Sequence, residues 1–173
     1  MSISMKVENI NSYLTFKLDH EIFAANVAKV LNILEMVKIT KVPKAPDYMK
    51  GIINLRGTVL PVIDTRIKFD MGETPISNNT CILVIEIDKD GEVIQLGAMV
   101  DAVLEVLEFD QQEISEPPSI GTKYDSEFLK GMVHKDDDFI MILNMDLIFS
   151  TEDLNIIKEK TKTSKKIEEV KKD

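Results

Sequence analysis

Short apolar segments separated by turn residues fill most of this chain, and they constrain its fold more than any other feature. In Tyr13–Leu18 every second side chain from Leu14 onward is apolar, which is the period of a strand with one buried face. Helical periodicity is confined to short stretches near Asn26–Leu31 and Asp47–Lys50 and to the C-terminal end. Further strands are predicted over Ile22–Ala25, Ile52–Leu55, Thr58–Ile63, Thr80–Ile87, Val93–Val100 and Phe139–Asn144. Many short strands with little helix predict an all-β protein built from barrels or a sandwich.

Turn residues predict hairpins at two places. Asp88–Glu92 contains both Asp and Gly and joins two long apolar segments, the clearest hairpin signal in the chain. Arg56 and Gly57 form a second, tighter connection. Pro61 lies in the segment after this turn, and because proline cannot donate to a ladder, it predicts an edge strand or a bulge there.

An internal repeat supports two similar units. Tyr48–Ile53 reads aromatic, apolar, Lys, Gly and two apolar residues, and Phe128–Val133 repeats this pattern 80 residues later. At the same offset, Val62–Asp64 matches Ile142–Asn144. A fixed offset kept across a strand–turn–strand stretch predicts duplicated barrels. Each unit alone is marginal in size, so we expect the two to pack against each other.

Composition narrows the class of function. The chain has 173 residues, 44% of them hydrophobic and 29% charged, as in ordinary globular proteins. Its net charge of −9 argues against nucleic-acid binding and against unaided binding to a membrane surface. No apolar run approaches the roughly 18 residues of a membrane span, and the start lacks the apolar run of a signal peptide, so we expect a cytoplasmic protein. The single cysteine, Cys81, excludes an intrachain disulfide.

Groups for catalysis are sparse. The two histidines, His20 and His134, fall in predicted turns without a carboxylate or cysteine at a catalytic or metal-binding spacing. The acidic stretches Asp88–Glu92 and His134–Asp138 are interpreted as solvated turns, and Cys81 as a small buried residue of a strand. We therefore predict no catalytic residue, metal or cofactor. An enzyme on a small β-barrel remains an alternative that requires a pocket lined by histidines or clustered carboxylates.

The densest pattern lies between residues 39 and 66. Two prolines keep its start extended, and Asp47 is expected to cap a single helical turn that ends at Gly51. Two strands then hold Arg56 at a hairpin tip, where it is either an interface anchor or a solvated turn residue. Asp64 and Arg66 are expected to cap or pair locally.

These residues carry a resemblance to a known family. Gly51–Gly57, Pro61–Asp64 and Arg66 are followed, in order and with matching spacing, by Val100–Val103 with Val106 and by Phe128–Gly131. The chain thereby resembles the chemotaxis coupling proteins, the CheW-like domain family, over roughly residues 12–158.

The resemblance implies a fold and a function. The fold is a pair of intertwined five-stranded, SH3-like β-barrel subdomains around a shared core, with short helices and a C-terminal helix. The function is that of a non-enzymatic adaptor in the cytoplasm, recruited to membrane-associated receptor arrays. It bridges the cytoplasmic tips of methyl-accepting chemoreceptors to the regulatory domain of the chemotaxis histidine kinase. The alternative is an adaptor of another chemosensory kinase pathway, such as surface motility or biofilm control.

The resemblance also implies interface positions. The family's receptor-facing groove includes a Val-x-Glu-Ile segment, which corresponds here to Val30–Ile33, so that Asn32 stands where glutamate is usual. The full set of implied receptor or kinase contacts is Val30, Asn32, Gly51, Arg56, Gly57, Val103 and Val106. For the two strand valines, a core position is an equally good interpretation.

The chain ends in a charged segment. Residues 1–11 are predicted to be an N-terminal arm, 12–158 the CheW-like domain, and 159–173 a charged, disordered tail. A helix is expected to begin near Ser150, capped by Ser150 or Thr151, and to fray within this tail.

Overall fold

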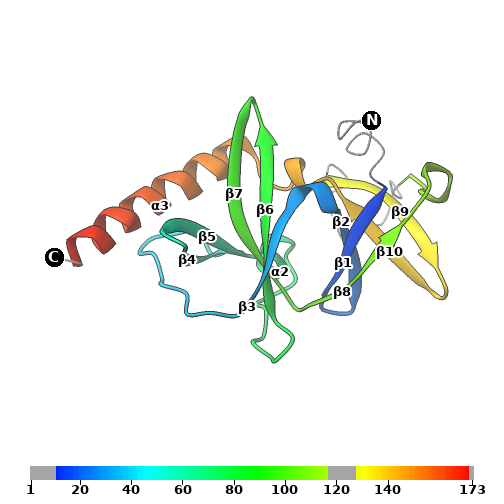
Figure 1. The fold of residues 1–173 in the computed structure, drawn as a ribbon, viewed down its shortest axis with the longest axis horizontal. Helices are drawn as coiled ribbons and strands as arrows, with labels where there is room; N and C mark the ends of the chain where they lie inside the picture. Colours follow the sequence, from blue (N-terminus) through cyan, green and yellow to red (C-terminus); the bar gives the residue numbers. More distant parts are fainter. Residues whose placement is uncertain (1–10, 117–127, 172–173) are drawn as a thin grey trace.

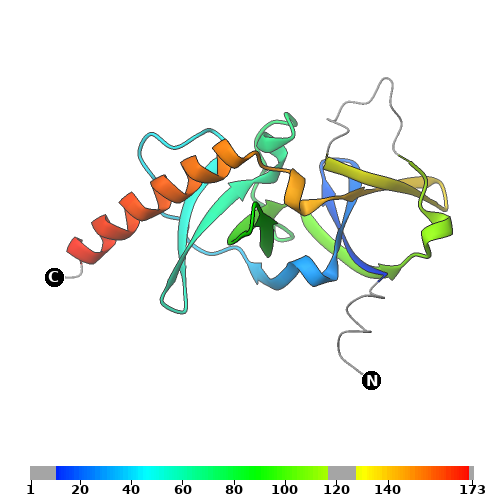
Figure 2. The same cartoon turned by 90° about the horizontal axis from the view of Figure 1, so that it is seen from above.

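Two five-stranded sheets form the body of the molecule (Figures 1 and 2). The computed structural model describes residues 11–116 and 128–171. Barrel A has the strand order β8-β1-β2-β10-β9 and consists of β1 (Ser12–Leu18), β2 (Glu21–Asn26), β8 (Ala102–Glu108), β9 (Leu129–Lys135) and β10 (Asp138–Leu143). Barrel B has the order β3-β6-β7-β5-β4 and consists of β3 (Val30–Glu35), β4 (Met49–Leu55), β5 (Thr58–Asp64), β6 (Cys81–Lys89) and β7 (Glu92–Val100).

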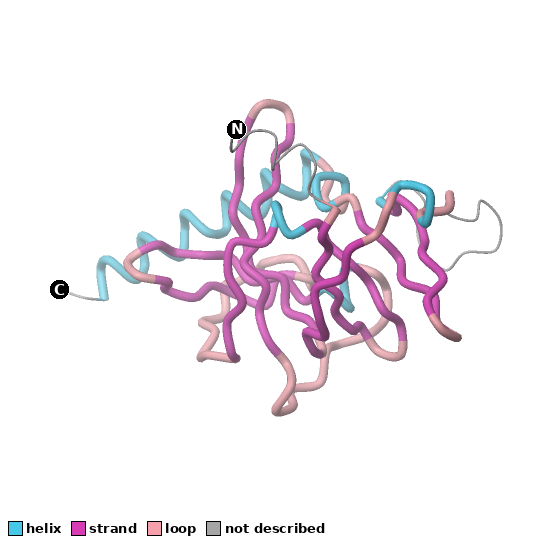
Figure 3. Tube along the Cα trace, turned by 45° about the vertical axis from the view of Figure 1, so that its right-hand side comes forward, coloured by secondary structure: helices cyan, strands magenta, loops and turns pink. Residues whose placement is uncertain are grey.

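Short helices connect the strands, and one long helix follows them. The short elements are η1 (Val27–Lys29), α2 (Thr65–Lys68), η2 (Gln111–Glu113) and η4 (Met145–Leu147). The long helix α3 (Thr151–Lys171) lies along barrel B and projects beyond it in Figure 1. Figure 3 shows how strands dominate the rest of the described chain.

The two barrels are intertwined copies of one arrangement. Barrel B is continuous in sequence, whereas barrel A combines the N-terminal hairpin β1–β2 with the late strands β8, β9 and β10. In each barrel an antiparallel hairpin contacts a third strand in parallel, β2 with β10 and β7 with β5. The predicted all-β fold of two intertwined five-stranded barrels is confirmed.

Backbone hydrogen bonds repeat at the offset seen in the sequence. The N–H of Asp64 donates to the carbonyl of Tyr48 at 2.7 Å, and that of Asn144 donates to the carbonyl of Phe128 at 2.8 Å. The Asp64 and Asn144 side chains then cap α2 and η4 respectively. The sequence repeat is therefore a repeat of structure, and Asp64 caps locally as predicted.

A single core joins the barrels. Its largest cluster takes Phe16 and Phe23 from barrel A, Leu83 and Ile85 from barrel B, and Ile157 from α3. Two smaller buried clusters lie within barrel A and within barrel B. The largest cluster therefore joins two barrels that each also have a small core of their own. Cys81 and the methionines Met99, Met141 and Met145 are buried, as the sequence predicts.

Two local predictions are wrong or incomplete. Asp47–Lys50 is not a helical turn: β4 already begins at Met49, which pairs with Ile63, so ladder pairing replaces the helix. The strand that contains Pro61 is not an edge strand, because β5 lies between β4 and β7. The pairing with β7 begins only at Val62, so Pro61 lies where β5 has one neighbour and its missing N–H breaks no second ladder.

The C-terminal helix extends further than the sequence-based boundary at residue 158. It continues to Lys171. Lys and Glu, which are good helix formers, make up most of residues 159–171, and they extend a helix whose first turns are anchored by buried Leu154 and Ile157.

Polar contacts fix the start of α3. The N–H of Asp153 donates to the Ser150 hydroxyl at 3.0 Å, and the N–H of Ser150 donates to the Asp153 carboxylate at 3.1 Å. This reciprocal cap confirms Ser150 as the capping residue. The Lys68 ammonium lies 3.2 Å from the same carboxylate, and the Tyr48 hydroxyl donates to it at 3.2 Å. Burial, together with the Asp153 charge, raises the pKa of Tyr48 to about 12.

We expect Asp153 to make folding stability depend on pH. Burial opposes its ionisation, but hydrogen bonds from Ser150 and the charge of Lys68 outweigh that effect and lower its pKa. A lowered pKa in the folded state gives stability that is present above the unfolded pKa of about 4 and is lost as the pH falls below it. Urea unfolding should show Asp153→Asn about 1 kcal/mol less stable than the parent near pH 6, with the gap narrowing near pH 3. A constant gap at both pH values would contradict this role.

Candidate partner-binding surface

The turn between β4 and β5 presents Arg56 to solvent. Arg56 and Gly57 both have positive φ, +53° and +86°, and the Asn54 side chain accepts the Gly57 N–H at 2.9 Å. The backbone of the turn is thereby fixed between two paired strands. Across the described residues, the exposed guanidinium has no ion pair or hydrogen bond. An arginine on a fixed backbone with unused donors can bind a carboxylate at little cost in ordering the turn.

The edge strand β3 carries the next group of predicted residues. Val30 is half-buried and packs on the shared core, whereas Asn32 is exposed and its side chain accepts the N–H of Ile33 at 2.8 Å. Leu31 and Ile33 flank Asn32, and each is 47% exposed. β3 therefore exposes two apolar side chains, with the neutral amide of Asn32 between them in sequence.

The remaining predicted residues lie apart from this strand. Val103 and Val106 belong to β8, the edge strand of barrel A: Val103 is half-buried against the shared core and Val106 is 56% exposed. Gly51 is buried beneath Thr40. The structure thus distributes the predicted positions over an edge strand of each barrel and the Arg56 turn, with Gly51 inside.

Sequence reasoning missed the strand character of β3 and β8. These strands occupy equivalent places in the two barrels, and each pairs with the first strand of a hairpin. Their sequences, Val-Leu-Asn-Ile-Leu-Glu and Val-Leu-Glu-Val-Leu-Glu, share one pattern, with exposed apolar residues at Leu31, Ile33, Leu104 and Val106. A search for that repeat would have located both strands.

Arg66 pairs across the barrels rather than locally. Its Nε donates to the Asp101 carboxylate at 2.8 Å, and a second guanidinium nitrogen also binds that carboxylate. Asp101 additionally accepts the backbone N–H of Asp19, in the β1–β2 turn of barrel A, at 2.9 Å. The hydrogen bonds to Asp101 raise the already high pKa of Arg66. This cluster ties α2, which follows β5 of barrel B, to a turn of barrel A.

Two absences among the described residues bear on function. Within residues 11–116 and 128–171, no group of three or more His, Cys, Asp or Glu side chains is placed to hold a metal ion. No helix in this described part is both long and apolar enough to cross a membrane.

Two small β-barrels pack around a shared cluster, with exposed apolar edge strands and an arginine on a fixed turn. The family model described as the CheW-like domain matches residues 12–153, and the chain therefore belongs to the CheW-like domain family.

Individual relatives agree with this assignment. A "Chemotaxis protein CheW" of Klebsiella aerogenes is 26% identical over 145 residues, which are 84% of this chain and 85% of the relative. A protein of the same name from Thermotoga maritima is 31% identical over 139 residues, 78% of this chain and 85% of the relative. The crystal structure of the scaffolding protein TtCheW from Thermoanaerobacter tengcongensis superposes with a TM-score of 0.73 at 34% identity. It covers 83% of this chain and 90% of that one.

Proposed function

We propose that this chain is a non-enzymatic chemotaxis adaptor that couples the cytoplasmic tips of methyl-accepting chemoreceptors to the regulatory domain of the chemotaxis histidine kinase. Family membership supports the chemotaxis role, since relatives carry that name and the solved relative is described as a scaffolding protein. The observation that carries the proposal is the Arg56 guanidinium, held on a fixed turn and unpaired within the described residues.

The receptor-facing surface in this proposal combines the Arg56 turn with β3. Leu31 and Ile33 supply exposed apolar area, and Arg56 supplies a cation for a receptor carboxylate. Asn32 bears no charge, so it adds no carboxylate to this surface. Specificity on this surface then depends on an acidic residue of the receptor.

The second surface in this proposal is β8 of barrel A, with Val103 and Val106. It belongs to the other barrel, so one chain has separate faces for two partners. The shared core and the Arg66–Asp101 pair connect these faces. A change imposed at one face can bias binding at the other through that junction, which is the physical requirement for a coupling protein.

The cellular location of the protein follows from its proposed partners, the receptor and the kinase. In this proposal the protein is cytoplasmic and reaches the membrane-associated array by binding receptor and kinase, with no insertion of its own. The net charge of −9 disfavours direct adsorption to an anionic membrane.

Arg56→Glu is expected to weaken binding to a receptor-tip fragment or to the kinase regulatory domain by about 2 kcal/mol or more. The melting temperature should change little, because Arg56 is exposed and glutamate can occupy the same turn conformation with similar strain. Isothermal titration calorimetry measures the first quantity and thermal unfolding the second.

Lys41→Glu makes the same charge change at a different exposed basic residue and serves as the matched control. Equal losses of affinity for both variants would show that the change in net charge, and not the position of Arg56, weakens binding. A large drop in melting temperature for Arg56→Glu alone would make Arg56 a structural residue and remove it from the interface.

A further inference from the structure

The two repeat-related hairpin turns carry opposite charges. Arg56 in barrel B and Asp136 in barrel A occupy equivalent turn positions, with φ of +53° and +54°. The first turn continues with glycine, the second with Asp137 and Asp138. Figure 1 shows the β4–β5 and β9–β10 hairpins toward opposite ends of the long axis. The two hairpin turns thus carry opposite charges at opposite ends of the molecule.

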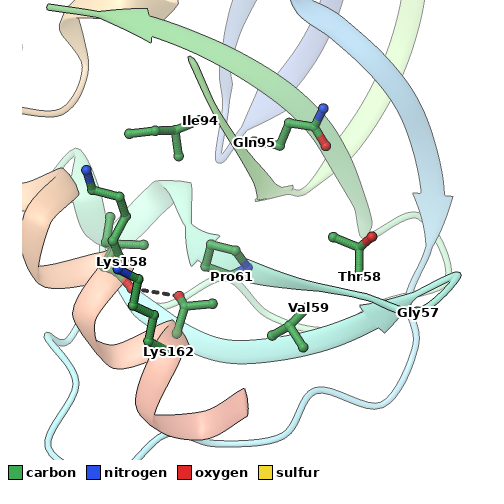
Figure 4. Close-up of a pocket in the computed structure, with 10 residues that line it drawn as sticks. Gly57, Thr58, Val59, Pro61, Ile94, Gln95, Lys158 and Lys162 are labelled. Atoms are coloured by element: carbon green, nitrogen blue, oxygen red, sulfur yellow. Dashed lines mark hydrogen bonds between the residues drawn. The ribbon is translucent and has the colours of Figure 1, made fainter. Parts of the chain in front are cut away.

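A groove opens beside the Arg56 turn. It lies between α3 and strands β5 and β7 and encloses about 340 Å³ (Figure 4). Val59, Pro61 and Ile94 provide apolar surface, and Gly57, next to Arg56, lies at one end. The groove is large enough for an aromatic side chain with part of its backbone.

Lysines of α3 form one wall of this groove. Lys158 and Lys162 stand on successive turns of the helix, beside the apolar residues of the strands (Figure 4). Lys158 is paired with Glu92 at 2.7 Å, whereas exposed Lys162 has no ion pair among the residues that the structure describes. In a chain with a net charge of −9, a groove with an unpaired cation on its wall favours an acidic occupant.

The β9–β10 hairpin has the complementary surface. Phe139 is 56% exposed and stacks on the His134 ring at a centroid distance of 4.9 Å. Asp136, Asp137 and Asp138 precede it, all exposed and without ion pairs in the described part of the chain. An exposed aromatic side chain beside three unpaired carboxylates is the combination that an apolar groove with cations can bury.

The internal repeat explains why Phe139 is exposed. Its equivalent in barrel B is Val59, which is half-buried and forms part of the groove against which α3 packs. Barrel A exposes Phe139 at the same position. The apolar position that α3 partly covers in barrel B is therefore left open in barrel A.

We propose that the β9–β10 hairpin of one molecule docks into the α3 groove of a second copy of this chain. Phe139 enters between the helix and β5, and the aspartates face Lys158 and Lys162. The contact joins different surfaces of the two copies, so it is head-to-tail and can add further copies. A single hairpin in a groove buries less than a standard interface of roughly 1,600 Å², so the association is weak.

Sedimentation velocity over a concentration series tests this contact on the full chain. At low salt, about 50 mM, the weight-average mass should rise with concentration, and it should rise less in about 500 mM salt. Phe139→Ala, Asp137→Lys and Lys162→Glu change exposed side chains and should each raise the dissociation constant at least about five-fold. Lys41→Glu and Asp47→Lys repeat the charge changes outside both surfaces and should associate like the parent.

Mixing two variants distinguishes a head-to-tail contact from any other. Asp137→Lys retains an intact groove, and Lys162→Glu retains an intact hairpin. Each alone should be impaired in association, but an equimolar mixture should associate more strongly than either variant, because the intact hairpin of one variant meets the intact groove of the other. Monomers in every sample, association unaffected by the variants, or a mixture no better than its components would each overturn the proposal.

Discussion

Replacing Gly51 with alanine is expected to cost about 3 kcal/mol or more of folding stability. Gly51 has a φ of +153°, and a Cβ atom there would lie 2.1 Å from the Thr40 carbonyl oxygen and 2.8 Å from Ile39 Cγ2. The Thr40 backbone cannot move away from such a Cβ atom easily, because it exchanges two hydrogen bonds of 2.8 and 2.9 Å with the Ile52 backbone. Urea unfolding monitored by circular dichroism measures the loss.

Gly91→Ala provides the matched control for this prediction. Gly91 also has a positive φ, +78°, but a Cβ atom there meets nothing within 4 Å, so alanine adds backbone strain without a clash. We expect a cost of about 1 kcal/mol at Gly91. Equal losses at the two glycines would show that the contact with Thr40 is not tight. A binding defect caused by a change at Gly51 would then need an explanation other than misfolding.

Leu83→Ala is expected to destabilise the protein by about 3–4 kcal/mol, with little direct effect on a partner-binding surface. Leu83 is 0% exposed, lies on β6 and belongs to the cluster that both barrels share. The loss should appear as one cooperative transition shifted to lower urea concentration, because the largest buried cluster joins the two barrels.

Leu104→Ala removes the same atoms from a leucine that is 43% exposed on β8. It should cost less than about 1 kcal/mol. Two separate unfolding transitions in Leu83→Ala, one for each barrel, would contradict the shared core.

Much of the fold could be predicted from the sequence because its strands follow simple rules. The hairpin β6–β7 has long apolar segments and a turn at Asp90 and Gly91, both with positive φ, and local residues alone specify such a turn. The offset repeat from Tyr48 to Phe128 predicted two barrels, and the hydrogen bonds of Asp64 and Asn144 follow that repeat.

The edge strands were harder to predict for a physical reason. In β3, Val30, Leu31, Ile33 and Leu34 are apolar, a spacing closer to a helix than to a strand. The strand has a register shift between Val30 and Asn32 and exposes apolar side chains on its outer face. Both features disrupt the alternation by which strands are recognised.

Contacts between residues far apart in the sequence could not be predicted from local sequence patterns either. Arg66 follows a capping residue and was expected to pair nearby, yet its partner Asp101 comes 35 residues later, where the chain passes from barrel B to barrel A. The exposure of Arg56 at its turn could be anticipated from the hairpin, because strand pairing fixes the tip. Its role at an interface remains a proposal that only binding can test.

In the proposed function, one molecule of this chain binds a receptor tip and the kinase regulatory domain at the same time. Calorimetric titration of a receptor-tip fragment into a preformed complex of this chain with the regulatory domain tests it directly. We expect saturable binding of the receptor fragment to the complex, with both partners retained in one species on size-exclusion chromatography. Release of the regulatory domain as the receptor fragment binds, or no binding of the receptor fragment at all, would contradict the account.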